Sequence, residues 1–259
     1  GGGLHGLYAS GRSPALMTPD RYAGQTSGSR RGWDGVTTPG CVSAWATLAE
    51  DHGTMPLATL LEPAAKLAED GFPVSPVVSY YWKRSARAYP KDGPFAEWHR
   101  TIAPSGRGPE VGEIVRLPDH ATTLREIGAT SGLSFYEGRL ADAMDQAARD
   151  QGGALRKADL AAHQYDWVRP IETDYHGLTL HEIPPNGQGL VALIALGILR
   201  HADIASPEVA SPRCLHLQIE AQKLAFRDGH RFIADPAHMD TTVGALLDDD
   251  YLASRARLI

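Results

Sequence analysis

Threonine pairs are the residues of this sequence whose type could support covalent chemistry. They occur at Thr37-Thr38, Thr122-Thr123 and Thr241-Thr242. A threonine acts as an N-terminal nucleophile, with its own α-amine as the base, only after the peptide bond before it has been cleaved. No pair opens the chain, and Thr241-Thr242 precedes the helical pattern VGALLDDDYL. We therefore predict that Thr241-Thr242 caps a helix and does not attack a substrate.

Histidines and aspartates gather near the C-terminal end and raise the question of a metal site. They are Asp228, His230, Asp235, His238 and Asp240. Zinc motifs place their ligands on one helix face or in tight pairs within loops, and HRFIADPAHMD offers neither arrangement. We expect a solvated loop here, with no metal site, and the sequence has no motif for a cofactor.

Arg12 is the candidate for binding a substrate carboxylate. It lies in the loop SGRSP, where the neighbouring glycine allows a guanidinium to be held toward a carboxylate in fork geometry. An isolated arginine in a loop is usually solvated. The residue type alone therefore leaves both interpretations open.

A turn rich in Pro and Gly, residues 184–189 (PPNGQG), separates an alternating stretch from an apolar run with helical spacing. This pattern predicts a strand, a turn and a helix. The first turn of such a helix offers free backbone N–H groups, which could bind a substrate anion or be satisfied internally.

Composition and charge narrow the class of protein. The chain has 259 residues, of which 42% are hydrophobic and 22% charged, as in an ordinary globular protein. The formal net charge of −6 gives no basic field for phosphates, so nucleic acid is not an expected partner. The longest apolar run, residues 189–199, is too short to span a bilayer.

Cys41 and Cys214 match no zinc or redox spacing and are expected to be buried thiols, which leaves the compartment undetermined.

The periodicity of apolar residues and the positions of Gly and Pro predict a mostly helical chain with few strands. The expected strands are a short one that starts at about Leu4 and ends near Gly11, and a hairpin of residues 167–175 and 177–183 that turns at His176-Gly177. The expected helices cover residues 42–52, 55–70, 75–88, 121–129, 136–150, 157–163 and 212–228, and a further helix follows the PPNGQG turn, where Leu190, Leu193, Ile194 and Ile198 recur at helical spacing. Residues 12–40 form a long loop, and such loops are often functional.

Three helices carry more specific expectations. Pro63 should kink or split the helix at residues 55–70. The aromatic side chains of residues 75–88 are expected to pack in the core, and Gly229 is expected to end the last long helix. One face of that helix carries Leu215, Ile219, Gln222 and Phe226.

Six segments, read together and in order, resemble the large-subunit part of the γ-glutamyltranspeptidase family. They are SGRSPA, GVTTPGCVSAWATLAEDHGTMPLATLLEPAAKLAEDGFPVS, SFYEGRLADAM, GGALRKADLAAHQ, YHGLTLHEIPPNGQG and FRDGHRFIADPA. The match runs from about Ser10 to the end, and the block at residues 35–75 and the PPNGQG turn are its most specific parts.

The resemblance implies an α+β fold of the N-terminal nucleophile (Ntn) hydrolase type, an αββα sandwich of which this chain is a mostly helical large-subunit part. Residues 1–259 would form a single unit, and the few strands would be explained by a sheet shared with a small subunit. In the family, autocleavage of the precursor frees a threonine that starts the small subunit and attacks a γ-glutamyl amide. The implied partners are that small subunit and a small-molecule γ-glutamyl or related amide, with no cofactor.

Two departures from the family pattern matter. The Thr-Thr-His cleavage motif is absent, because Thr242 is followed by Val243, so this chain alone is expected to be inactive. When Pro14 is aligned with the family's Ala-Pro, Ser10 takes the place of the arginine that grips the substrate carboxylate, and Arg12 follows two residues later. Either Arg12 reaches the same carboxylate from a shifted loop, or γ-glutamyl substrates lose this anchor. The alternatives are a cephalosporin-acylase-like or oxamate-amidohydrolase-like amidase of the same fold, or a catalytically inactive scaffold or binding homologue.

Overall fold

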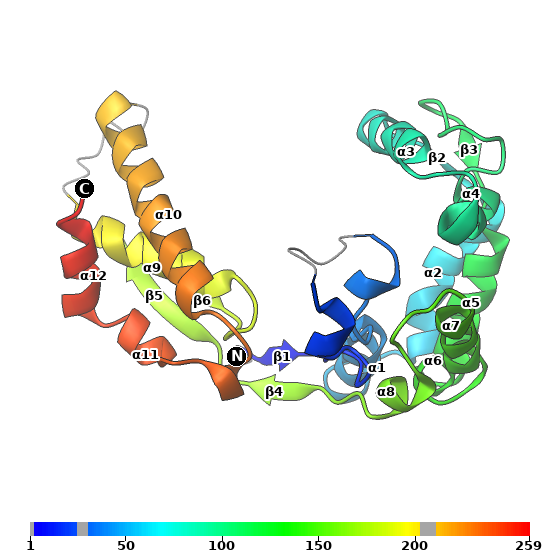
Figure 1. The fold of residues 1–259 in the computed structure, drawn as a ribbon, viewed down its shortest axis with the longest axis horizontal. Helices are drawn as coiled ribbons and strands as arrows, with labels where there is room; N and C mark the ends of the chain where they lie inside the picture. The colour runs from blue at the N-terminus through cyan, green and yellow to red at the C-terminus, as the bar shows by residue number, and fades with distance from the viewer. Residues whose placement is uncertain (1–2, 25–30, 203–210) are drawn as a thin grey trace. The chain divides into compact units, whose positions relative to one another are not determined.

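The computed structural model describes residues 3–24, 31–202 and 211–259, and helices dominate it (Figure 1). The contacts within the chain divide it into two compact units. Unit 1 combines Gly1–Tyr8 with Asp166–Ile259, and unit 2 is Ala9–Tyr165. Each unit has its own buried apolar clusters. The expectation that residues 1–259 form a single unit stays a prediction.

Unit 1 contains two antiparallel strand pairs and a group of helices. Its elements are β1 (Gly6–Tyr8), β4 (Asp166–Val168), β5 (Ile171–Tyr175), β6 (Leu178–Glu182), α9 (Gly189–Arg200), α10 (Pro212–Phe232), η4 (Pro236–His238), α11 (Val243–Leu246) and α12 (Asp249–Ala256). β1 pairs with β4, and β5 pairs with β6. The predicted hairpin is confirmed: His176 and Gly177 form its turn with φ values of 48° and 80°, which suits a two-residue turn with both central residues at positive φ.

Helix α9 is the centre of the core of unit 1. Leu190, Leu193, Ile194 and Ile198 are fully buried along it. The helix is covered on several sides by β5, α10 and α12, which accounts for its nearly uniform apolar sequence. The predicted order of strand, turn and helix around residues 184–189 is confirmed.

The prediction that Gly229 ends the long helix is wrong, because α10 continues to Phe232. Gly229 is buried, and a Cβ built on it would lie 2.6 Å from Cγ2 of Val191 in α9. The glycine is therefore a packing residue that lets α10 approach α9 closely. For the same reason α10 buries small residues, Cys214, Ala221 and Ala225, while Leu215, Ile219 and Phe226 are exposed.

A buried ion pair joins α10 to α12. Nη2 and Nε of Arg255 donate to the two oxygens of Asp228 at 2.8 and 3.0 Å. The side chains are 6% exposed for Asp228 and 17% exposed for Arg255. The bidentate geometry satisfies both carboxylate oxygens in a place that water hardly reaches.

Unit 2 is mostly helical. Its elements are η1 (Pro19–Tyr22), η2 (Trp33–Gly35), α1 (Cys41–Asp51), α2 (Leu57–Asp70), β2 (Phe72–Pro73), α3 (Pro76–Ala88), η3 (Gly93–Phe95), α4 (Ala96–Ile102), β3 (Ile114–Val115), α5 (Pro118–Ala129), α6 (Leu133–Tyr136), α7 (Arg139–Asp150) and α8 (Lys157–Ala161). β2 and β3 form a short antiparallel pair. α2 and α5 pack against each other through Ala65, Ala68 and Ala121. The predicted α+β character, with few strands, is confirmed.

Two expectations in unit 2 need correction. α2 continues through Pro63, so the expected split is wrong, whereas a kink stays a prediction; the ring is exposed, on the side of the helix where water can solvate the carbonyl that the proline leaves unpaired. The aromatic side chains of α3 do not all pack in the core, since Tyr80 and Tyr81 are 60% and 59% exposed. The inner face of α3 carries the small residues Ser79 and Ala86, and Ser79 Oγ donates to the carbonyl of Pro109 at 2.7 Å. A loop therefore lies close to this face and leaves no room for rings.

The two thiols differ. Cys214 is buried as expected, whereas Cys41 is exposed at the start of α1, and both are free.

No helix in the part of the chain that the structure describes is both long and apolar enough to cross a lipid bilayer.

We expect Arg255→Ala to lower the free energy of unfolding by about 3–5 kcal/mol, because it leaves the Asp228 carboxylate buried without its partner. Urea unfolding followed by circular dichroism measures the change. Arg231→Ala is the matched control, since Arg231 pairs with Asp240 at 3.4 Å on the surface and should cost at most about 1 kcal/mol. Similar losses for the two variants would contradict the importance of burial at Asp228.

Candidate functional site

The threonine pairs take structural roles. Thr242 Oγ1 accepts from the backbone N–H of Ala245 at 3.1 Å, so the predicted cap of a helix, α11, is confirmed. Thr122 and Thr123 lie inside α5, and their hydroxyls donate to carbonyls one turn earlier. Thr38 is buried in the loop before α1.

The histidines and aspartates near the C-terminal end are separated by their own partners. Asp228 pairs with Arg255, Asp240 with Arg231, and Asp235 caps η4 through Ala237. The ring of His230 stacks on Phe226. Among the residues with described positions, no group of three or more His, Cys, Asp and Glu side chains is placed to hold a metal ion.

The PPNGQG turn is tied to its own unit. The hydroxyl of Tyr8 in β1 hydrogen-bonds to the side-chain oxygen of Asn186, and the N–H of Asn186 donates to the same hydroxyl at 3.2 Å. Gly189, the first residue of α9, has the carboxylate of Glu182 packed against it. A carboxylate at this end of the helix suits the positive end of its dipole.

The loop that carries Arg12 is fixed by direct contact between two backbones in unit 2. A Cβ built on Gly11 would overlap the carbonyl oxygen of Thr38, and one built on Gly40 would overlap that of Ala9. The N–H of Thr38 donates to the carbonyl of Arg12 at 3.0 Å. Glycine at both positions is therefore what allows residues 9–12 to lie against residues 38–40.

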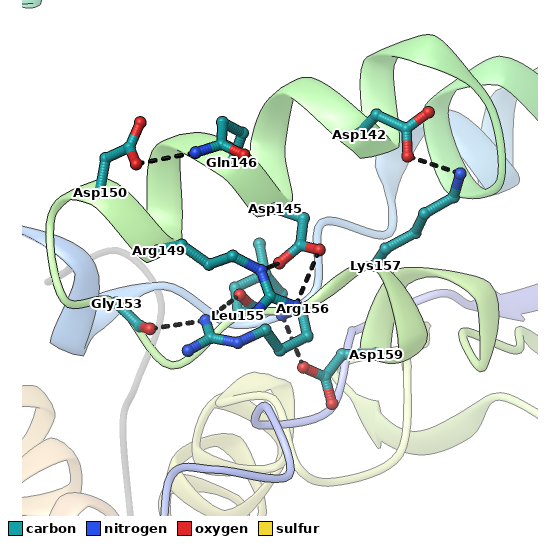
Figure 2. A network of polar contacts seen from close by, with 10 residues as sticks. All are labelled: Asp142, Asp145, Gln146, Arg149, Asp150, Gly153, Leu155, Arg156, Lys157 and Asp159. Atoms are coloured by element: carbon teal, nitrogen blue, oxygen red, sulfur yellow. Dashed lines mark hydrogen bonds and ion pairs between the residues drawn. The ribbon is translucent and has the colours of Figure 1, made fainter.

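Asp159 supports the same loop from α8. Its Oδ1 accepts from the N–H of Ala15 at 2.9 Å, and its Oδ2 accepts from the N–H of Arg156 at 2.8 Å. Figure 2 shows the polar network around this residue, in which the guanidinium of Arg156 also donates to the carbonyls of Gly153 and Leu155 at 2.8 and 2.7 Å. Lys157 and Asp142 join α8 to α7 at 2.6 Å. Asp159 is thus held in place, and each of its oxygens accepts a backbone N–H.

Tyr136 of α6 caps the N-terminus of α1 from outside the helix. Gly40, the N-cap residue, has no side chain, and the N–H of Ser43 donates to the hydroxyl of Tyr136 at 3.0 Å. That hydroxyl donates in turn to the carbonyl of Pro39 at 2.8 Å. Burial raises the pKa of Tyr136, so the hydroxyl keeps the proton that it donates.

His163, just after α8, also supports the first turn of α1. Its Nε2 lies 2.8 Å from Ser43 Oγ, and its ring stacks on Tyr136 with the centroids 5.1 Å apart. Ser43 Oγ lies 2.7 Å from the carbonyl of Gly40. Burial lowers the pKa of His163 below its usual value near 6.5, so the ring is neutral at pH 7.

A cavity of about 140 Å³ lies between these segments, all within unit 2. Its lining consists of Arg12, Ser13, Ala15, Thr38, Asp159, Ala162, His163 and Gln164. Arg12 is exposed, and its guanidinium has no hydrogen bond or ion pair with the residues that the structure describes. Since Asp159 is occupied and His163 neutral, Arg12 is the free cation of the cavity lining and can bind a small carboxylate.

The role of Arg12 as the substrate-binding residue stays a prediction. Sequence reasoning missed Tyr136, Ser43, Asp159 and His163. All four lie in the segments that carry the family resemblance, but local patterns say nothing about which distant segments meet. The histidine shows no signal of its own in GGALRKADLAAHQ.

The family model described as Gamma-glutamyltranspeptidase matches residues 2–259 of the chain. The Glutathione hydrolase-like YwrD proenzyme of Bacillus subtilis is 32% identical over 251 residues, which cover 96% of this chain and 47% of that protein. The oxamate amidohydrolase proenzyme of Klebsiella pneumoniae is 33% identical over 254 residues, which cover 95% of this chain and 47% of that protein.

The crystal structure of cephalosporin acylase from Bacillus halodurans matches with a TM-score of 0.92 at 43% identity, over 99% of this chain and 49% of that one. Since the match covers 47% of each of the two curated relatives, this chain spans about half of their length.

We expect Tyr136→Phe to lower the free energy of unfolding by about 1–2 kcal/mol, because Ser43 loses its cap and Pro39 loses its donor. Urea unfolding measures this. Tyr81→Phe is the control, since the hydroxyl of Tyr81 lies on an exposed side chain of α3 and should change stability by less than about 0.5 kcal/mol. A loss no greater than that of the control would show that Tyr136 does not cap α1.

Proposed function

Because this chain belongs to the γ-glutamyltranspeptidase family, we propose that it is the large-subunit portion of an amide hydrolase or acyl transferase whose threonine nucleophile lies outside residues 1–259. Family membership confirms the resemblance seen in the sequence, and with it the α+β fold of the Ntn hydrolases. The observation that supports a substrate site is the free guanidinium of Arg12 in a cavity that the family's specific segments build.

In the proposed reaction the other half of the precursor supplies the nucleophile. The threonine hydroxyl adds to the amide carbonyl carbon, and its proton passes to the threonine's own α-amine. The C–N bond then breaks, the protonated amine leaves, and the acyl group remains as an ester on the threonine. Transfer to water gives hydrolysis, and transfer to an acceptor amine gives a new amide. This chain would contribute scaffold and Arg12, and would be inactive alone.

The role of Arg12 would be to orient the acyl group. A guanidinium in fork geometry binds a carboxylate through two parallel hydrogen bonds, which fixes the direction of the chain attached to it. The loop under Arg12 is rigid on both sides, through residues 38–40 and through Asp159. A carboxylate bound there would therefore be presented in one orientation to a nucleophile on the partner subunit.

A second candidate is an amidase of the same fold that acts on an acyl group other than γ-glutamyl. It is favoured by the displacement of Arg12 from the family's arginine position and by the 43% identity to a cephalosporin acylase. Turnover of γ-glutamyl-p-nitroanilide, of a glutaryl amide and of oxamate separates these candidates. A catalytically inactive scaffold or binding homologue would turn over none of them.

We expect Arg12→Ala in the whole protein to raise KM for a carboxylate-bearing substrate roughly 10- to 150-fold, which corresponds to the loss of a charge-assisted contact of about 1.5–3 kcal/mol. Steady-state kinetics measures the change. The matched control is Arg84→Ala, an exposed arginine of α3 away from the cavity. An unchanged KM in Arg12→Ala would end the assignment of a carboxylate to this residue.

We expect the full-length protein to yield two polypeptides, the second beginning with threonine, because the nucleophile needs a free α-amine. Intact mass and N-terminal sequencing measure this directly. A single uncut chain would instead support the inactive scaffold.

A further inference from the structure

A second cavity of unit 2 lies between α3 and the loop that joins α4 to β3, and it shares no lining residue with the Arg12 cavity. Its volume is about 320 Å³, within the roughly 300–1,000 Å³ of sites that hold small molecules. The lining includes Lys83, Arg87, Gly106, Arg107, Gly108 and Glu110. Three cations and one carboxylate therefore surround a space that the proposed reaction does not use.

The positive charge of this region stands out in an acidic chain. The formal net charge of the whole protein is −6, whereas residues 76–113 carry six Lys and Arg residues and four Asp and Glu residues. Lys91 also lies close to the cavity, because a Cβ built on Gly106 would be 3.4 Å from its Nζ. The local field therefore favours an anionic ligand over a cationic one.

The two arginines of the cavity keep donors for a ligand. Arg87 makes no hydrogen bond or ion pair with the residues that the structure describes. Arg107 uses its Nη1 for the carbonyl of Gly108 at 3.0 Å and for Glu113, which is outside the lining, at 2.9 Å. These contacts hold the guanidinium of Arg107 in place and leave the donors of its Nε and Nη2. Both arginines can therefore bind an oxyanion without giving up a partner that they already have.

The loop that forms one wall of the cavity is fixed against α3. A Cβ built on Gly108 would lie 2.5 Å from the backbone nitrogen of Lys83, so glycine is what lets the loop approach the helix this closely. Ser79 of α3 donates to the carbonyl of Pro109 at 2.7 Å, and both residues are buried. A ligand would meet a backbone that is already ordered, which lowers the entropic cost of binding.

The charges of the lining indicate the class of ligand. Glu110 pairs with Lys83 at 2.5 Å, and the three cations of the lining exceed its one carboxylate by two charges. A guanidinium presents its donors in a planar fork that matches a carboxylate or a phosphate. A phosphate monoester, with a charge of about −1.5 to −2 at pH 7, and a small dicarboxylate both balance the excess.

We propose that the cavity between α3 and the loop after α4 is a binding site for a small organic dianion, a phosphate monoester or a dicarboxylate, held by Arg87 and Arg107. The chemistry that the two ligands share is a double negative charge on oxygen atoms that accept from guanidinium groups. The proposal does not rest on the proposed function, because it uses no residue of the Arg12 cavity.

Calorimetric titration of the full-length protein with inorganic phosphate, glycerol 3-phosphate and succinate tests the proposal. We expect saturable binding of at least one of these dianions, weakened by added salt because exposed charges are screened. Acetate, which carries one charge, should bind about tenfold more weakly or less. Tighter binding of glycerol 3-phosphate than of succinate identifies a phosphate ligand, and the reverse order identifies a dicarboxylate. If none of the three dianions binds saturably, the proposal is wrong.

Substitutions on α3 then locate the site. Arg87→Ala should weaken binding of the dianion roughly 10- to 100-fold through loss of a charge-assisted contact, and Arg87→Lys should lose less because it keeps the charge without the fork. Arg84→Ala is the matched control, since Arg84 is an exposed arginine of the same helix that does not line the cavity. We expect it to change the affinity by less than about twofold. Equal losses in Arg84→Ala and Arg87→Ala would reveal attraction to a positive surface and overturn the site, as would an unchanged affinity in Arg87→Ala.

Discussion

The contact between two backbones, residues 9–12 and residues 38–40, is the constraint on which the candidate site depends. A side chain at Gly11 or Gly40 would overlap a carbonyl of the other segment, so the two loops can meet only through glycine. Everything else around Arg12 reinforces this contact. Tyr136 binds the carbonyl of Pro39, Ser43 binds that of Gly40, and Asp159 binds the N–H of Ala15. The arginine side chain is free, but the backbone from which it extends is not.

Close approach through small residues also organises the helices. Gly229 brings α10 against α9, and alanines bring α2 against α5. Packing of this kind buries little side-chain volume per residue. Each helix pair is therefore stabilised mainly by van der Waals contact between backbones and methyl groups that lie close together. It also explains why large apolar residues of α10 and α3, such as Ile219 and Tyr81, are exposed in the described chain. Their helices use the small residues for the inward face.

This distinction explains how far the sequence could predict the structure. Features governed by neighbouring residues were predicted correctly: the hairpin at His176-Gly177, the cap at Thr242, and the strand, turn and helix around residues 184–189. Features governed by distant partners were not. Gly229 looks like a helix stop until Val191 is seen against it, and Pro63 looks like a break until its exposed position is known.

The candidate site divides in the same way. Arg12 could be singled out from its loop and from the family resemblance, whereas His163 and Tyr136 gain meaning only when they meet α1. No periodicity or motif links residues that lie more than a hundred positions apart, as Ser43 and His163 do. The physical reason is that such contacts depend on how whole elements pack, while sequence patterns report the requirements of a single element.

Recognition and bond breaking would therefore have separate structural origins. The group proposed to bind the acyl head, the guanidinium of Arg12, extends from a loop that is held by hydrogen bonds within one compact unit of this chain. The nucleophile would come from the remainder of a protein about twice as long, if the lengths of the curated relatives apply. Substitutions around the cavity could then change the preferred acyl group without disturbing the chemistry of the threonine. Such a separation would account physically for a family in which proteins named for glutathione, oxamate and cephalosporin substrates share one fold.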